Sequence, residues 1–395
     1  MVFPERFSNL PDYAFPRLRS LLDAHEPGGE VLHLSIGQPA HPFPDWVAEG
    51  IAATAQEFRL YPPNDGAPEL LAAISSWLSR RYGVQVPVDR IMALNGSREG
   101  LFNTVLALCP ETARNGDRPA VLVPNPFYQV YAVGALTIGA EPVYVSATED
   151  SGFLPDYAAL PSDVLDRTEV AFVCSPGNPQ GAVATRDYWA QLLTLAEHHD
   201  FRIIADECYS EIYRHDPPVG LMQVAEDVGA DPERAIIIHS LSKRSNLAGL
   251  RSGFVAAGPE SMRHIRRLRA YSGAPVPLPI QRVSERLWGD EDHVEASRKL
   301  YQAKYDVADA VFAGVDGCAA PEGGFFLWLP VDDGEAATTK LWRETGVRVL
   351  PGAYLARETT PGGGTPGDGY IRVAMVAPKE ELQHGLTRLR DCLYT

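Results

Sequence analysis

The stretch Ala235-Ile-Ile-Ile-His-Ser-Leu-Ser-Lys243, followed shortly by Gly249-Leu-Arg251, carries the clearest indication of both fold and chemistry in this chain. An apolar run of this kind predicts a strand buried on both faces, and it leads directly into a lysine that follows two hydroxyl residues, Ser240 and Ser242. Burial lowers the pKa of a lysine, and a neutral amine can attack a carbonyl to form a Schiff base. Ser240, Ser242 and Arg251 add donors that suit a phosphate dianion. Taken alone, however, this lysine is more simply explained as an ordinary strand-end residue with an arginine nearby by chance.

Other short apolar runs alternate with longer amphipathic stretches along the chain. This alternation predicts an α/β fold, in which helices cover a mostly parallel sheet. The expected strands are residues 91–94, 120–124, 141–145, 170–175, 202–206, 235–240 and 253–257, and the expected helices include 98–108, 187–198 and 259–271.

The last third of the chain has a different pattern and predicts a smaller α+β unit. We expect one long helix over residues 291–312 and a closing helix over 379–394, with short strands at 323–329, 347–350 and 370–375. Three prolines within residues 275–279 break any helix, so the boundary between the two units is expected there. Residues 361–369 are rich in glycine and proline and predict a mobile surface loop.

Two further motifs follow predicted strands. Asp206-Glu-Cys-Tyr209 closes one strand, where open α/β sheets bind their ligands. A buried aspartate requires a cationic partner, and a pyridinium nitrogen would serve, although a helix-capping aspartate is an equally simple explanation. Ser175-Pro-Gly-Asn-Pro-Gln-Gly181 closes another strand and presents Asn178 from a tight loop, although a plain turn would have the same composition.

A third motif, Asn95-Gly-Ser-Arg-Glu-Gly100, lies between a predicted strand and a predicted helix. A glycine turn that enters a helix presents free N–H groups and the positive end of the helix dipole to an anion. Such a motif is common, so on its own it does not establish an anion site.

Composition excludes several classes of function. The formal net charge of −16 disfavours binding to nucleic-acid backbones and to anionic membrane surfaces. We find no signal peptide, no apolar run long enough to span a membrane and no repeat. The five cysteines are scattered and include no Cys-x-x-Cys pair, so we expect a reducing, cytoplasmic location and no metal site.

Taken together, the motifs resemble class I/II aminotransferases of the pyridoxal-phosphate fold-type I superfamily. Their order and spacing match the family pattern over residues 34–372. The resemblance implies a large domain at residues 45–278 with a mostly parallel central sheet, and a smaller α+β domain made of residues 1–44 and 279–395. It also implies a homodimer with active sites shared between the subunits.

The resemblance implies specific roles for the residues that match the family motifs. Lys243 binds the cofactor, pyridoxal phosphate, and later moves a proton. Asp206 pairs with the pyridine nitrogen, Asn178 and Tyr209 bind the phenolic oxygen, and Tyr128 stacks on the ring. The residues implied around the phosphate are Ser97, Arg98, Ser240, Ser242, Arg251 and, from the neighbouring subunit, Tyr61.

For Arg98 we expect the backbone N–H to matter more than the guanidinium. Arg372 is implied to hold the substrate α-carboxylate as a bidentate pair, near Gly37 and Asn178. Read without the family, Arg372 would be an ordinary strand-edge arginine.

The implied reaction moves an amino group from an amino acid to a 2-oxo acid, usually with glutamate and 2-oxoglutarate as one pair. Residues 95–102, 124–128, 175–179, 241–245 and 350–357 resemble the succinyldiaminopimelate aminotransferases of lysine biosynthesis. The chain departs from that branch at Gln38 and Ala40, where the branch often has Glu and Lys. His41 and Arg244 are then candidates for the distal end of the substrate, or have only structural or surface roles.

Two other classes of function remain open on sequence. A C–S β-lyase would share the lysine, the aspartate and the arginine, and release of pyruvate without an added keto acid would distinguish it. A non-catalytic regulator would need a DNA-binding unit. The roughly thirty residues before residue 35 leave no room for one, and the negative charge also argues against it.

Overall fold

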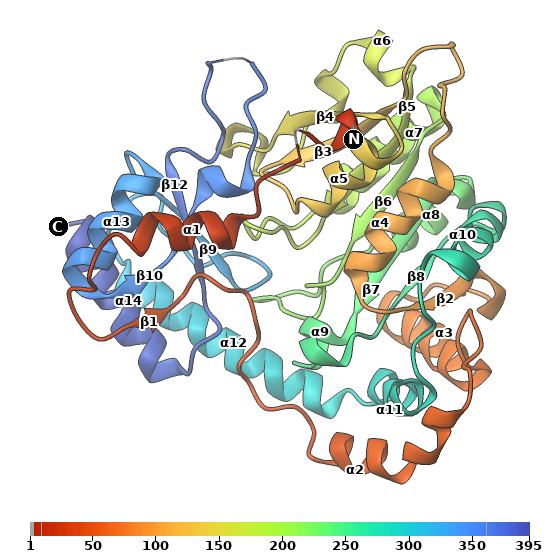
Figure 1. Ribbon diagram of the computed structural model, residues 1–395, viewed down its shortest axis with the longest axis horizontal. Coiled ribbons are helices and arrows are strands. Elements are labelled where there is room, and N and C mark those ends of the chain that lie inside the picture. The colour runs from red at the N-terminus through yellow and green to blue at the C-terminus, as the bar shows by residue number, and fades with distance from the viewer. Residues whose placement is uncertain (1–3, 9, 361) are drawn as a thin grey trace.

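The computed structural model describes residues 4–8, 10–360 and 362–395. Its centre is a seven-stranded sheet of order β2-β8-β7-β6-β5-β3-β4 (Figure 1). Every neighbouring pair is parallel except those that involve β8, which runs antiparallel to both β2 and β7. The strands are β2 Ile91–Leu94, β3 Ala120–Asn125, β4 Glu141–Ser146, β5 Thr168–Cys174, β6 Arg202–Asp206, β7 Ala235–Ser240 and β8 Gly253–Ala256. The predicted α/β fold with a mostly parallel sheet is therefore confirmed.

Helices cover both faces of this sheet, which explains why its strands are apolar without alternation. Along β6, Ile203 packs into one hydrophobic core and Ile204 into the other, because successive side chains point to opposite faces. One core lies under α4 (Ser97–Leu108), α5 (Val130–Thr137) and α10 (Pro259–Ser272). The other lies under α3 (Pro68–Tyr82), α7 (Arg186–His199), α8 (Leu221–Val228) and α11 (Leu278–Gly289).

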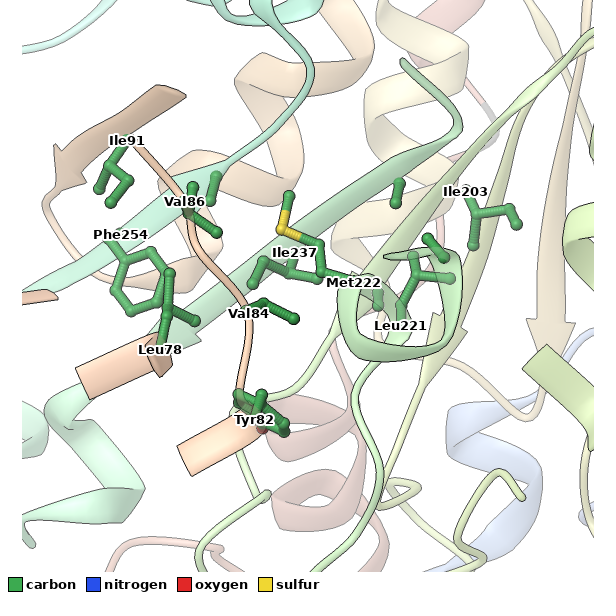
Figure 2. Packing of buried hydrophobic residues seen from close by; sticks show 14 of the residues in the cluster. Leu78, Tyr82, Val84, Val86, Ile91, Ile203, Leu221, Met222, Ile237 and Phe254 are labelled. Atoms are coloured by element: carbon green, nitrogen blue, oxygen red, sulfur yellow. The ribbon is translucent and has the colours of Figure 1, made fainter. Parts of the chain in front are cut away.

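Figure 2 shows part of this second core, where side chains of α3 and α8 meet the sheet. Leu78 and Leu221 approach from the helices, while Ile237 and Phe254 come from the strands; all four are fully buried. Burial of each such side chain contributes about 1.5–3 kcal/mol to folding. These contacts fix the strands that end at the site described below.

The smaller unit contains two separate short sheets. One pairs β1 (Leu32–His33) with β10 (Val347–Arg348) in parallel, and the other has the order β11-β12-β9 and is antiparallel. Its strands are β11 Leu350–Pro351, β12 Tyr370–Ala374 and β9 Phe326–Pro330, and its helices are α12 Asp292–Val311, α13 Gly334–Thr345 and α14 Lys379–Leu393. The single strand predicted at 347–350 is wrong, because the chain changes partner there, from β1 to β12.

The packing of α11 differs from the expected division of the chain. This helix begins just after residue 277 and packs against α3 and α2 (Trp46–Ala53), and its Leu287 and Trp288 belong to a core of the large sheet. We therefore propose that the large unit extends to about Asp290. Helix α1 (Ala14–Leu22) contacts α13 and β11 of the smaller unit, and β1 pairs with β10.

Of the loop expected at 361–369, Pro361 lies outside the described residues. Thr365 donates to Asp368 through both its backbone N–H and its hydroxyl, and Gly367 is buried, so the end of this loop is packed. In the described part of the chain, no helix is both long and apolar enough to cross a membrane.

Candidate active site

A cavity of about 480 Å³ lies at the carboxyl ends of the parallel strands, between the two units. Strands β6 and β7 end in this cavity at Asp206 and Ser240. Their ends lie side by side because Asp206 is in register with Ile238. The predicted site residues that line the cavity are Gly37, Ser97, Arg98, Tyr128, Asn178, Asp206, Tyr209, Ser240, Ser242, Lys243, Arg251 and Arg372.

Lys243 lies on α9 (Leu241–Arg244), the short helix that begins immediately after β7. Ser240 caps this helix, because its Oγ accepts the backbone N–H of Ser242 at 3.1 Å. The Lys243 Nζ donates to the backbone oxygen of Gly37. Burial lowers the pKa of Lys243 to about 8, and the guanidinium groups of Arg372 and Arg251 act in the same direction. A substantial neutral fraction near neutral pH is what a Schiff-base lysine requires.

Asp206 presents a fully buried carboxylate at the end of β6. Its Oδ2 accepts a hydrogen bond from the Tyr131 hydroxyl at 2.8 Å, and its Oδ1 accepts from the backbone N–H of Cys208 at 3.3 Å. Burial raises the pKa of Asp206 above its ordinary value. No lysine, arginine or histidine of the described residues forms an ion pair with it. A protonated ring nitrogen of pyridoxal phosphate fits this position, since it would supply the missing cation.

A group of donors surrounds the start of α4. Gly96 precedes this twelve-residue helix with φ +82°, and Ser97 is its first residue. Arg251 lies directly against the glycine, where a Cβ would overlap its Nη2, and donates to the backbone oxygens of Asn95 and Ala248, both at 3.0 Å. The hydroxyls of Ser240 and Ser242 are 2.9 Å apart. Hydroxyls, a guanidinium and helix N–H groups are the donor set that a phosphate dianion prefers.

Arg372 on β12 faces the same cavity from the smaller unit. Its Nη1 donates to Asn178 Oδ1 and its Nη2 to the backbone oxygen of Ser35, both at 2.9 Å, and its Cζ lies 4.1 Å from the centre of the Phe326 ring. Burial lowers the pKa of Arg372 to about 10, so the group remains a cation at neutral pH. Its Nε is buried and has no partner among the described residues. Donors therefore remain for a carboxylate ligand.

Three aromatic or cationic side chains complete the wall. Tyr209 packs edge-on against Phe326, and burial raises its pKa well above the ordinary value, so it remains a neutral phenol. Arg98 Nε donates to the Tyr128 hydroxyl at 2.6 Å. The guanidinium of Arg98 is thus part of the wall, whereas the sequence led us to emphasise its backbone N–H.

Three candidates from the sequence lie outside the cavity. Tyr61 is fully exposed in its own subunit. His41 packs against Tyr301 with ring centres 4.4 Å apart and planes tilted by 49°, and burial lowers its pKa to about 4. Arg244 is buried and donates to Leu287 O and to Glu291 Oε1, both at 2.7 Å. The contacts of His41 and Arg244 are those of structural residues.

Sequence reasoning missed a second group of lining residues. They come from the N-terminal segment, from the start of α5 and from the smaller unit, and they include Tyr13, Phe15, Ile36, Gln129, Phe326 and Leu355. Most of them are apolar or aromatic, so polar motifs at strand ends gave no indication of them; Gln129 directly follows Tyr128, and only its neighbour was chosen as a candidate.

A family model for class I and II aminotransferases matches residues 29–389. The chain belongs to this family and is a pyridoxal-phosphate-dependent aminotransferase.

Individual relatives cover essentially the whole chain. It is 31% identical to a protein named LL-diaminopimelate aminotransferase from Dehalococcoides mccartyi, over 99% of both chains. Among solved structures, an aminotransferase from Neisseria meningitidis is 36% identical with a TM-score of 0.93, covering 98% of this chain and 99% of that one. A probable N-succinyldiaminopimelate aminotransferase from Thermus thermophilus is 26% identical with a TM-score of 0.81, covering 97% and 98%.

Proposed function

We propose that this aminotransferase takes the amino group of N-succinyl-diaminopimelate and transfers it to 2-oxoglutarate, which becomes glutamate. The observation that carries this proposal is the charge of the cavity. Among the described residues that line it, Lys243 and Arg251 are assigned to the cofactor and Arg372 to the α-carboxylate, which leaves the guanidinium of Arg98; the one carboxylate, Asp206, is also assigned to the cofactor. The succinylated donor and glutamate both carry a carboxylate at their distal end, and such a wall favours it over an ammonium group.

The relatives support a diaminopimelate-type donor and leave its acylation state open. The Dehalococcoides protein is named for unacylated LL-diaminopimelate and the Thermus protein for the succinylated form. Unacylated LL-diaminopimelate carries an ammonium group beside the carboxylate at its distal end, whereas succinylation replaces this charge with a neutral amide and adds a further carboxylate. Because the described residues of one subunit's cavity offer this ammonium group no carboxylate besides Asp206, we place LL-diaminopimelate second.

In this reaction, each of the site residues would have a separate role. When bound, pyridoxal phosphate supplies an electron-accepting ring conjugated to the amino acid's α-carbon. Arg372 binds the α-carboxylate and so fixes which bond of the α-carbon faces Lys243. Lys243 removes the α-proton as general base and returns a proton as general acid. Asp206 keeps a proton on the ring nitrogen, while Asn178 and Tyr209 orient the ring through its phenolic oxygen.

The test is a half-reaction screen with the cofactor-loaded enzyme and single amino acids. N-succinyl-LL-diaminopimelate, LL-diaminopimelate, glutamate, aspartate and an aromatic donor are each added while the loss of the lysine-bound cofactor absorbance is followed. We expect fast conversion with the succinylated donor and with glutamate. Faster conversion with unacylated LL-diaminopimelate would overturn the proposed donor and would leave the aminotransferase class intact.

A further inference from the structure

Tyr131 is buried beside the cavity without lining it. Only 1% of its surface is exposed, and its hydroxyl donates to Asp206 Oδ2 at 2.8 Å, across 75 positions of sequence. The other carboxylate oxygen accepts from the backbone N–H of Cys208 at 3.3 Å. Tyr131 therefore supplies a hydroxyl donor to one oxygen of Asp206, while Cys208 lies against the carboxylate through its backbone N–H and its thiol.

The ring of Tyr131 is held in one orientation. It stacks on Phe172 of β5 with centres 4.5 Å apart and planes at 14°, and Tyr128 meets it edge-on at 5.8 Å. The hydroxyl is therefore aimed by packing in the core as well as by the carboxylate. Because Tyr128 is also the residue expected to stack on the cofactor ring, Tyr131 contacts two of the groups that define the position of the cofactor.

Tyr131 is also fixed in its role as a donor. Burial, together with the nearby charge of Asp206, raises the pKa of Tyr131 well above its ordinary value, so the phenol keeps its proton at every working pH. A hydrogen bond from a neutral donor to a buried carboxylate stabilises the ionised form. An ionised and oriented carboxylate is what a protonated ring nitrogen requires.

We propose that Tyr131 is a positioning residue that holds the carboxylate of Asp206 in the orientation that binds the ring nitrogen of the cofactor. The proposal rests on the assignment of Asp206 to that nitrogen under the proposed function. Tyr131 is not among the residues that line the cavity, so in this role it acts through Asp206.

The test compares two ligands of the cofactor-free enzyme, pyridoxal phosphate and its 1-deaza analogue, in which carbon replaces the ring nitrogen. Tyr131→Phe removes the hydroxyl and keeps the ring contacts. We expect this variant to bind pyridoxal phosphate about tenfold more weakly than the wild type, the effect of one lost hydrogen bond to a charged group. Binding of the deaza analogue should be unchanged, because this ligand does not use the carboxylate.

Tyr157→Phe is the matched control. Tyr157, in a short 3₁₀ turn (Tyr157–Ala159), is equally buried, and its hydroxyl donates to the backbone oxygen of Phe172 at 2.5 Å, away from Asp206. This variant loses a comparable buried hydrogen bond, and its affinity for both ligands should match that of the wild type. Thermal unfolding of both variants without ligand measures how much stability the protein loses with each hydrogen bond.

The outcomes separate this inference from the proposed function. If the wild type does not prefer pyridoxal phosphate over the deaza analogue, the assignment of Asp206 fails. If the wild type has this preference, two results would overturn the positioning role. One is that Tyr131→Phe keeps the full preference, and the other is that it lowers the affinity for both ligands equally. Should Tyr131→Phe not fold, Phe172→Leu keeps the hydroxyl and loosens the ring. A reduced preference in that variant supports the role, and an unchanged preference refutes it.

Discussion

At the residue scale, Lys243 is an amine buried among other cations, and its burial opposes folding. Its pKa of about 8, lowered from 10.5, means that the folded chain binds this proton more weakly than the unfolded chain does. The charged form is therefore penalised at pH 7, by about 3 kcal/mol at 1.36 kcal/mol per pKa unit. We predict that the cofactor-free Lys243→Met variant is more stable than the wild type at neutral pH by up to roughly that amount. Urea unfolding measures it.

The pH dependence of the difference in unfolding free energy between the wild type and Lys243→Met provides a second test of this prediction. A lowered pKa in the folded state makes the wild type gain stability relative to the variant as pH rises from about 8 to 10.5, where the unfolded lysine also loses its proton. The difference should therefore shrink over that range. Lys340→Met on α13 is the control, because Lys340 is exposed and its one hydrogen bond among the described residues is to the backbone oxygen of Cys392. A Lys243 variant no more stable than this control would contradict the prediction.

At the scale of elements, the entry into α4 depends on one glycine. Gly96 has φ +82°, and a Cβ there would overlap the guanidinium of Arg251. We predict that Gly96→Ala displaces Arg251 and weakens binding of pyridoxal phosphate to the cofactor-free enzyme by about ten- to a hundredfold, the effect of losing one charged hydrogen bond. Fluorescence titration of the cofactor-free protein measures it.

Gly83 provides the matched control for this prediction. It ends α3 with φ +75°, and a Cβ there would meet nothing within 4 Å. Gly83→Ala therefore introduces backbone strain of order 1 kcal/mol without the clash, and this strain is smaller than at Gly96, whose φ of +82° and ψ of 164° lie in a region that glycine alone adopts readily. It should lower the melting temperature and leave cofactor affinity unchanged. Equal loss of affinity in both variants would mean that strain, and not the position of Arg251, is responsible.

Comparison of elements with their sequence patterns shows why much of the site could be predicted. Apolar runs located the strands within a few residues, and polar motifs directly after those runs, such as Asp206 and Ser240, had to meet at one sheet edge. Tyr131 could not be found this way. It lies on a helix, its hydrogen-bond partner is 75 positions away, and a buried tyrosine has the same local pattern whether or not it bonds a carboxylate.

Elements of the smaller unit were harder to predict, because their partners are distant and their strands very short. Two of the strands, β10 and β11, have only two residues each and are separated by Val349. The single apolar run over 347–350 therefore contains parts of two strands that belong to different sheets. The amphipathic pattern of helix α11 would suit packing against either the large unit or the smaller unit. Only its contacts with α3 show which unit covers its apolar face.

At the scale of the whole molecule, the cavity exists only where the two units meet. Asp206 and Lys243 come from the large unit, and Arg372 comes from a strand of the smaller unit. One candidate from the sequence, Tyr61, remains apart. Its side chain is fully exposed, as Phe58 and Leu60 are in large part, while a 3.0 Å ion pair between Asp65 and Arg266 holds the same loop against α10. An exposed apolar group on a fixed loop is typical of a subunit interface.

We therefore predict that Tyr61 serves the cavity of a second copy, and subunit mixing can test this directly. Lys243→Ala and Tyr61→Ala chains, each inactive or nearly so alone, are unfolded together and refolded as a mixture. Half of the resulting dimers are hybrids, and in each hybrid one site combines an intact Lys243 with an intact Tyr61 from the other chain. Activity should recover to at most about a quarter of the wild-type value. If Tyr61 acted within its own subunit, every site in the hybrid would lack one of the two residues, and mixing would restore nothing.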